Sequence, residues 1–196
     1  MYDIRWLDLD GVVNMRDVGG MPTRDGGRIA LGRLLRSDNL QELTDRSIAA
    51  LLEHEGVSDI VDLRSLVELD REGPGPLVGH PGVRISHFSL YAADSQASAL
   101  PPGERELPWK TQAREKGWLP SGQDETHPEH DEHWSRHYLG YLDQRPDSII
   151  NALRTIAGAP GAVVVHCAAG KDRTGTVTGL ALMVAGAEPE AVVQDF

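Results

Sequence analysis

The segment at residues 162–186 constrains the fold most, because it indicates a buried strand that leads straight into a helix. Ala162-Val163-Val164-Val165 has the apolar, β-branched composition of a strand buried on both faces. Residues 173–184 show the pattern of a helix, and Gly186 is suited to its end. A strand, a short loop and a helix in this order are the building unit of α/β folds with a parallel sheet.

The rest of the chain follows the same alternation of strands and helices. Short apolar runs predict further strands at residues 34–36, 57–63 and 83–90. The spacing of apolar residues predicts helices at 44–54, where Thr44 is the N-cap, at 133–142, from Pro146 onward and from near Glu188. We therefore expect an α/β fold with a mostly parallel central sheet flanked by helices.

Residues 93–133 differ in composition from their surroundings, because Ala, Ser, Pro, Gly, Glu and His dominate them. Such a stretch is too polar to form its own core, so we interpret it as an insertion or lid loop in a single domain at residues 1–196. Four histidines have a spacing that would share one helix face, as metal ligands would: His127, His130, His133 and His137. The surrounding acids and Pro128 favour a solvated face, and we expect no metal.

The composition excludes several classes of protein. A net charge of -11, from 30 acids against 19 bases, argues against non-specific nucleic-acid binding. The single cysteine excludes a disulfide scaffold. No apolar run has the length of a membrane helix, and the first residues do not have the pattern of a signal peptide. We expect a cytoplasmic protein without an integral membrane segment, and secretion without a signal peptide stays open.

The loop that joins the strand to the helix carries the chemistry, and it reads His166-Cys167-Ala168-Ala169-Gly170-Lys171-Asp172-Arg173-Thr174. Ligands of open α/β sheets bind at this end of the strands, and a helix N-terminus with successive loop amides binds anions. The helix dipole and the nearby bases favour the thiolate of Cys167. Arg173 offers a planar fork for two phosphate oxygens. Thr174 is placed to hydrogen-bond the thiolate, and Gly170 lets the backbone approach the ligand.

Two other readings of this loop are weaker. An inert buried cysteine would leave the ordered run of Gly, Lys, Asp, Arg, Thr and Gly without a reason. A Walker A loop needs Ser or Thr directly after Gly-Lys and a glycine at the start, whereas this chain has Asp172 and Val165 there.

A cysteine followed by five residues and an arginine, between a strand and a helix, resembles the signature loop of protein tyrosine phosphatases and their dual-specificity relatives. The longer run from His166 to Gly175 resembles the atypical bacterial family of these enzymes. Three more segments resemble that family, at residues 14–20, 36–40 and 62–65. Rhodaneses and arsenate reductases use a similar loop. Rhodaneses normally lack the Lys-Asp-Arg-Thr-Gly run, and arsenate reductases of the thiol-cascade kind need further cysteines, which this chain does not have.

The resemblance implies a phosphotyrosine phosphatase-like fold and a cysteine-dependent hydrolysis of phosphomonoesters through a phosphocysteine intermediate, without a cofactor. Cys167 would be the nucleophile, and Arg173 with the loop amides would hold the phosphate oxygens. The expected substrate-binding residues are His166, Ala168, Ala169, Gly170, Lys171, Thr174 and Arg64. Phosphorylated proteins, small phosphomonoesters and phosphoinositides are the expected partners. Phosphoinositides are included because lipid phosphatases of the superfamily also carry a lysine in the loop, as this chain does at Lys171.

The general acid stays open between Asp62 and Asp172, because the chain has no Trp-Pro-Asp sequence. Either aspartate could instead hold an arginine in place. A set of charged residues is expected to border the pocket or to form salt bridges near it: Arg16, Asp17, Arg36, Asp38 and Arg64. A phosphate-binding pseudophosphatase that docks phosphorylated partners is the alternative function. The family continues with further helices beyond the segment near Phe196, so we expect this chain to be a truncated form.

Overall fold

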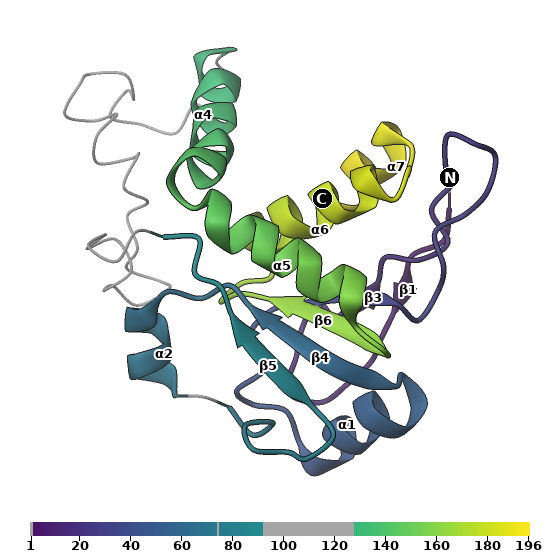
Figure 1. The fold of residues 1–196 in the computed structure, drawn as a ribbon, viewed down its shortest axis with the longest axis vertical. Helices are drawn as coiled ribbons and strands as arrows, with labels where there is room; N and C mark the ends of the chain where they lie inside the picture. The colour runs from purple at the N-terminus through teal and green to yellow at the C-terminus, as the bar shows by residue number, and fades with distance from the viewer. Residues whose placement is uncertain (1, 74, 92–127) are drawn as a thin grey trace.

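A computed structural model describes residues 2–73, 75–91 and 128–196, and for residues 128–134 it describes the backbone alone (Figure 1). Its centre is a six-stranded sheet with the order β1-β2-β3-β6-β4-β5. The strands are β1 (Arg5–Trp6), β2 (Arg16–Asp17), β3 (Leu34–Ser37), β4 (Val57–Asp62), β5 (Arg84–His87) and β6 (Ala162–His166). The four strands from β3 to β5 in this order run parallel, whereas β1 and β2 add an antiparallel edge.

Helices cover the sheet on both faces (Figure 1). The bounds are α1 (Asp45–Ala49), the π-helical turn η1 (Ala50–His54), α2 (Leu66–Glu72), α4 (Pro128–Gln144), α5 (Pro146–Gly158), α6 (Asp172–Val184) and α7 (Pro189–Asp195). α5 and α6 pack on one face of the sheet, and α1 with η1 lies on the other. The expected α/β fold with a mostly parallel sheet is therefore confirmed.

The central strand β6 shows how the sequence builds two cores. Successive side chains of a strand point to opposite faces, so alternate residues enter different cores. Val163 and Val165 join the cluster under α5 and α6, whereas Ala162 and Val164 join the cluster under α1. All five β6 residues are buried, which explains why its first four, Ala162 to Val165, form an unbroken apolar run.

Several elements differ from the sequence-based expectation. The strands β1 and β2 and the helix α2 were not expected, because each is very short. Helix α4 begins at Pro128, five residues before the expected start at His133, and so takes up the end of the proposed 93–133 insertion. The rest of that insertion, residues 93–127, lies outside the described residues. Thr44 caps α1 as expected, by accepting a hydrogen bond from the Ser47 amide.

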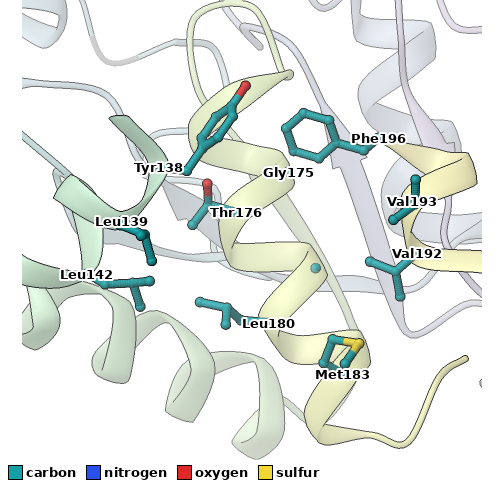
Figure 2. Close-up of a pocket in the computed structure, with 11 residues that line it drawn as sticks. Tyr138, Leu139, Leu142, Gly175, Thr176, Leu180, Met183, Val192, Val193 and Phe196 are labelled. Atoms are coloured by element: carbon teal, nitrogen blue, oxygen red, sulfur yellow. The ribbon is translucent and has the colours of Figure 1, made fainter. Parts of the chain in front are cut away.

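Helices α4 and α7 flank α6 and leave an apolar groove of about 450 Å³ between them (Figure 2). Its walls are formed by aliphatic and aromatic side chains of these three helices: Tyr138, Leu139, Leu142, Leu180, Met183, Val192, Val193 and Phe196. None of the helices described is both long and apolar enough to cross a lipid bilayer.

Candidate active site

The loop after β6 lies where three parallel strands end together. His166, the last residue of β6, is in register with Ser37 at the end of β3 and with Asp62 at the end of β4. Cys167 follows directly and is buried, and α6 begins at Asp172. The expected position of the loop, at the carboxyl edge of the sheet and at a helix N-terminus, is the observed one.

The loop is held from outside through its carbonyl oxygens. Three residues of the N-terminal part of the chain donate hydrogen bonds to four consecutive loop carbonyls. The bonds run from the Asn39 amide to Ala168 (3.2 Å), from Asn14 Nδ2 to Ala169 (2.9 Å), and from Arg36 Nη2 to Gly170 (2.9 Å) and Lys171 (3.2 Å). These donors lie in or beside the segments at 14–20 and 36–40 that resemble the family, so the segments serve to shape the loop.

This arrangement fixes the direction of the loop amides. No peptide bond in the described residues is cis, and across a trans peptide the C=O and the following N–H point in opposite directions. The amides of residues 169–172 therefore point away from the residues that hold the carbonyls. Successive amides that face the same side can form a nest for an anion, and the N-terminus of α6 adds its positive dipole end.

Gly170 makes the tight turn of the loop possible. Its φ of +65° lies in the left-handed region, and a Cβ there would stand 2.4 Å from the Ser37 carbonyl oxygen and 2.5 Å from the Asp38 nitrogen. Both the backbone conformation and the space against the end of β3 thus require glycine.

Arg173 is held by a residue that the sequence analysis did not identify. Glu68 in α2 accepts two hydrogen bonds from its guanidinium, at 2.6 Å from Nη1 to Oε2 and at 3.0 Å from Nη2 to Oε1. The Arg173 guanidinium also lies 4.8 Å from the centre of the Tyr91 ring. Burial disfavours the charge, but the neighbouring Cys167 sulfur and Glu68 carboxylate together raise the pKa of Arg173. Arg173 therefore stays a cation with a fixed orientation.

The sequence contains a signal for Glu68. Ser65 and Glu68 form a capping box, in which the Ser65 side chain accepts from the Glu68 amide and the Glu68 carboxylate accepts from the Ser65 amide. The Ser-x-x-Glu spacing is the pattern of such a helix start. It would have located α2, although not the contact of Glu68 with Arg173, which is 105 residues away in the chain.

The Asp62 carboxylate pairs with Arg64 and lies close to His166. Its carboxylate accepts hydrogen bonds from the Arg64 side chain at 2.7–3.1 Å and from the Arg64 amide at 2.9 Å. Burial opposes the charge, but His166 and Arg64 beside it lower the pKa of Asp62. Burial lowers the pKa of His166, whose Nε2 lies 3.7 Å from Asp62. Asp62 is thus an ionised partner of Arg64, and Arg64 is buried against it.

Asp172 has a different environment, because it lies half-buried at the first position of α6. Tyr138 of α4 donates a hydrogen bond of 2.7 Å from its hydroxyl to Asp172 Oδ1. Burial and this bond raise the pKa of Tyr138, so the hydroxyl stays protonated. Figure 2 shows Tyr138 beside the first turns of α6, next to Phe196. The contact orients one carboxylate oxygen of Asp172.

The charged residues expected to border the pocket are tied to other groups. Arg16 and Arg36 are both buried and both pair with Asp195 of α7. Asp17 accepts from the amides of Gly19 and Gly32, and Asp38 accepts from the amide of Val13. These residues shape the backbone around the loop. The sequence left open whether they border the pocket or form salt bridges near it, and the contacts described here are of the second kind.

The remaining expected residues of the loop differ in exposure. Ala169 and Lys171 are exposed, Ala168 is half-buried, and Thr174 is fully buried. The Thr174 hydroxyl has no hydrogen-bond partner among the residues that the structure describes. A buried hydroxyl without a partner is unfavourable, so this one is available for a thiolate or a bound ligand.

The histidine cluster falls mostly outside the described part of the chain. His127 is not described, and only the backbone of His130 and His133 is. His137 lies 2.9 Å from the Tyr141 hydroxyl through Nε2. Within residues 2–73, 75–91 and 128–196, no group of three or more His, Cys, Asp or Glu residues could hold a metal ion.

Comparison with known proteins places this chain in a family. The model of the tyrosine phosphatase family matches residues 7–196. The chain is 30% identical over 194 residues to the triple specificity protein phosphatase PtpB of Mycobacterium tuberculosis, covering 96% of this chain and 67% of that protein. It is 24% identical over 190 residues to a Cupriavidus necator protein named as a tyrosine-protein phosphatase, covering 97% of this chain and 61% of that protein.

The chain therefore belongs to the tyrosine phosphatase family. Its enzyme class is that of a protein tyrosine phosphatase, as the resemblance of the loop predicted.

Proposed function

We propose that the chain hydrolyses phosphomonoesters through a phosphocysteine intermediate. The Cys167 thiolate attacks phosphorus, and the bond from phosphorus to the leaving oxygen breaks as the new S–P bond forms. Water then attacks phosphorus, which releases inorganic phosphate and restores the thiolate. The observation that carries this proposal is the loop after Cys167, whose carbonyls are held from outside so that its amides face the other way, while Glu68 holds Arg173 in a fixed orientation.

Asp172 is the general acid in this proposal. It begins α6 directly beside the anion site, and its carboxylate is oriented by Tyr138. Asp62 is less suited to the role, because burial opposes its charge but His166 and Arg64 lower its pKa, and a lower pKa makes it a weaker holder of the proton that a general acid must give. Asp62 instead keeps Arg64 in place through their buried ion pair.

The substrate class in this proposal includes phosphotyrosine, phosphoserine and phosphothreonine in proteins, and phosphoinositides. Lys171 supports the lipid part, because its exposed side chain at the rim of the loop could meet a second phosphate on an inositol ring. The relative from Mycobacterium tuberculosis carries triple specificity in its name, which also supports a broad range. A cytoplasmic location is part of the proposal, since a catalytic thiol with no second cysteine is protected best by external thiols.

The test is hydrolysis of p-nitrophenyl phosphate by the wild type and by Cys167→Ser. We expect turnover that the substitution abolishes, while phosphate binding persists. Absence of Cys167-dependent turnover, with phosphate still bound, would leave the pseudophosphatase as the remaining function.

The acid is tested separately by the pH–rate profile. Asp172→Asn should lose the alkaline limb of kcat/KM, which reports a group that must be protonated. Asp62→Asn should keep it, and the reverse result would exchange the two roles.

For the lipid activity, Lys171→Ala should slow phosphatidylinositol phosphate turnover more than p-nitrophenyl phosphate turnover, and equal effects on both would remove Lys171 from the proposal.

A further inference from the structure

Helix α7 packs closely against α6 because two glycines of α6 face it. A Cβ on Gly175 would stand 2.3 Å from the Phe196 ring, and one on Gly179 would stand 3.5 Å from Val192. Figure 2 shows Phe196 over Gly175 at the start of α6, immediately after the loop. This close approach brings the residue before Phe196, Asp195, to the underside of the loop.

Asp195 connects two buried arginines at this position. Its Oδ1 accepts from Arg16 Nε at 2.7 Å, and its Oδ2 accepts from Arg36 Nη1 at 2.6 Å. Its backbone carbonyl accepts a third bond of 2.8 Å, from Arg16 Nη2. The three side chains are only 1–7% exposed, so one carboxylate serves two guanidinium groups away from water.

Arg36 carries this contact to the loop. One end of its guanidinium, Nη1, pairs with Asp195, and the other end, Nη2, donates to the carbonyls of Gly170 and Lys171. Burial lowers the pKa of Arg36, and the Asp195 carboxylate acts against that effect. A guanidinium is planar and rigid, so an anchor at one end fixes the direction of the other. The orientation of the loop amides of Lys171 and Asp172 follows from that of these carbonyls.

We propose that Asp195 is a positioning residue for the phosphate-binding loop and acts on it through Arg36. The proposal rests on the proposed function, because it concerns the geometry of the same anion site. In this arrangement α7 is part of the active-site framework, and Asp195 acts on the loop through Arg36.

The first variant is Asp195→Asn, which keeps the size of the side chain and removes its charge. The readouts are inhibition by orthovanadate, a probe of the loop amides and Arg173, and kcat with p-nitrophenyl phosphate. We expect both vanadate affinity and kcat to fall about 10- to 100-fold, as for other small displacements of catalytic groups. Glu190→Gln is the matched control, because it removes an exposed charge from the same helix, and we expect wild-type values.

A second variant, Asp195→Asn combined with Arg16→Met, distinguishes an effect of Asp195 on the loop from a purely structural effect on stability. Removing Arg16 as well restores the net charge of the buried cluster, so stability should recover relative to Asp195→Asn alone. Arg36 still lacks its carboxylate anchor, so vanadate affinity and kcat should stay low in the double variant. Near-UV circular dichroism and thermal melting establish the fold of each variant.

Wild-type vanadate affinity in either folded variant overturns the proposal, as does an equal loss in Glu190→Gln. If neither variant folds, Asp195 determines the whole fold and not the loop, which overturns it too. Failure of the proposed function has a different signature, because the wild type itself would then show no Cys167-dependent turnover.

Discussion

Glu68 holds both ends of the Arg173 fork, so the arginine is oriented before any substrate arrives. Glu68→Gln keeps one acceptor oxygen but loses the charge and the paired geometry. We expect kcat/KM for p-nitrophenyl phosphate to fall about 10- to 100-fold because Arg173 can then turn away from the phosphate. Asp70→Asn, an exposed position of the same helix, is the control. A Glu68→Gln enzyme with wild-type kcat/KM would show that the loop alone orients Arg173.

His166 makes stability depend on pH. Burial lowers the pKa of His166 from the ordinary 6.5. In the folded protein His166 is therefore still neutral at pH values where the same side chain in the unfolded chain already binds a proton. Stability should therefore be complete above about pH 6.5 and decrease below it, by up to about 1.4 kcal/mol per pH unit. Urea unfolding between about pH 7.5 and pH 5.5 measures this slope. His166→Asn should flatten it and the exposed His54→Asn should not. An unchanged slope in His166→Asn would assign the effect to other groups.

The sequence revealed the residues that stand together in one segment and missed those that meet by folding. Cys167, Asp172 and Arg173 lie close together in one short segment, so their spacing predicts their chemistry. Glu68 and Asp195 contact that loop or its support across separations of 105 and 159 residues. Such contacts depend on the packing of whole helices, and a single sequence has no local signal for them.

At the scale of elements, length decided what could be predicted. The strand β6 and the helix α6 are long enough to show a clear pattern, and both were predicted within about one residue. The strands β1 and β2 have two residues each, too few for any alternation to appear. They form because β2 pairs with β3 and β1 pairs with β2, which brings Arg16 beside Arg36 and within reach of Asp195.

The junction between β3 and the loop gives a prediction at this scale. Gly170→Ala would force a Cβ into the backbone of Ser37 and Asp38 and would leave alanine in a left-handed conformation. We expect a loss of at least about 2 kcal/mol in the free energy of unfolding, with activity reduced as the loop shifts.

Gly158→Ala is the matched control, because a Cβ there meets nothing within 4 Å and its φ is not positive. It should be neutral or stabilising by about 0.5–1 kcal/mol. Chemical unfolding of both variants gives the comparison, and equal stability of the two would show that the loop backbone can adapt.

At the scale of the whole molecule, the net charge of -11 bears on how the proposed site binds an anion. Four arginines at or near the loop each have a carboxylate partner: Arg16 and Arg36 share Asp195, Arg64 pairs with Asp62, and Arg173 pairs with Glu68. In the proposed function, anion binding therefore depends on oriented amides and one fixed guanidinium, within a protein whose net charge is negative.

This balance predicts how salt affects catalysis. A phosphate dianion that approaches the site is repelled by the net charge, and added NaCl screens that repulsion, since the Debye length falls from about 30 Å at 0.01 M to about 10 Å at 0.1 M. We expect KM for p-nitrophenyl phosphate to decrease about two- to threefold over this range, with kcat unchanged. Sucrose at equal osmolality is the control, because it changes water activity without screening charge. A KM that rises with NaCl would mean that the positive charge of the loop outweighs the field of the whole protein.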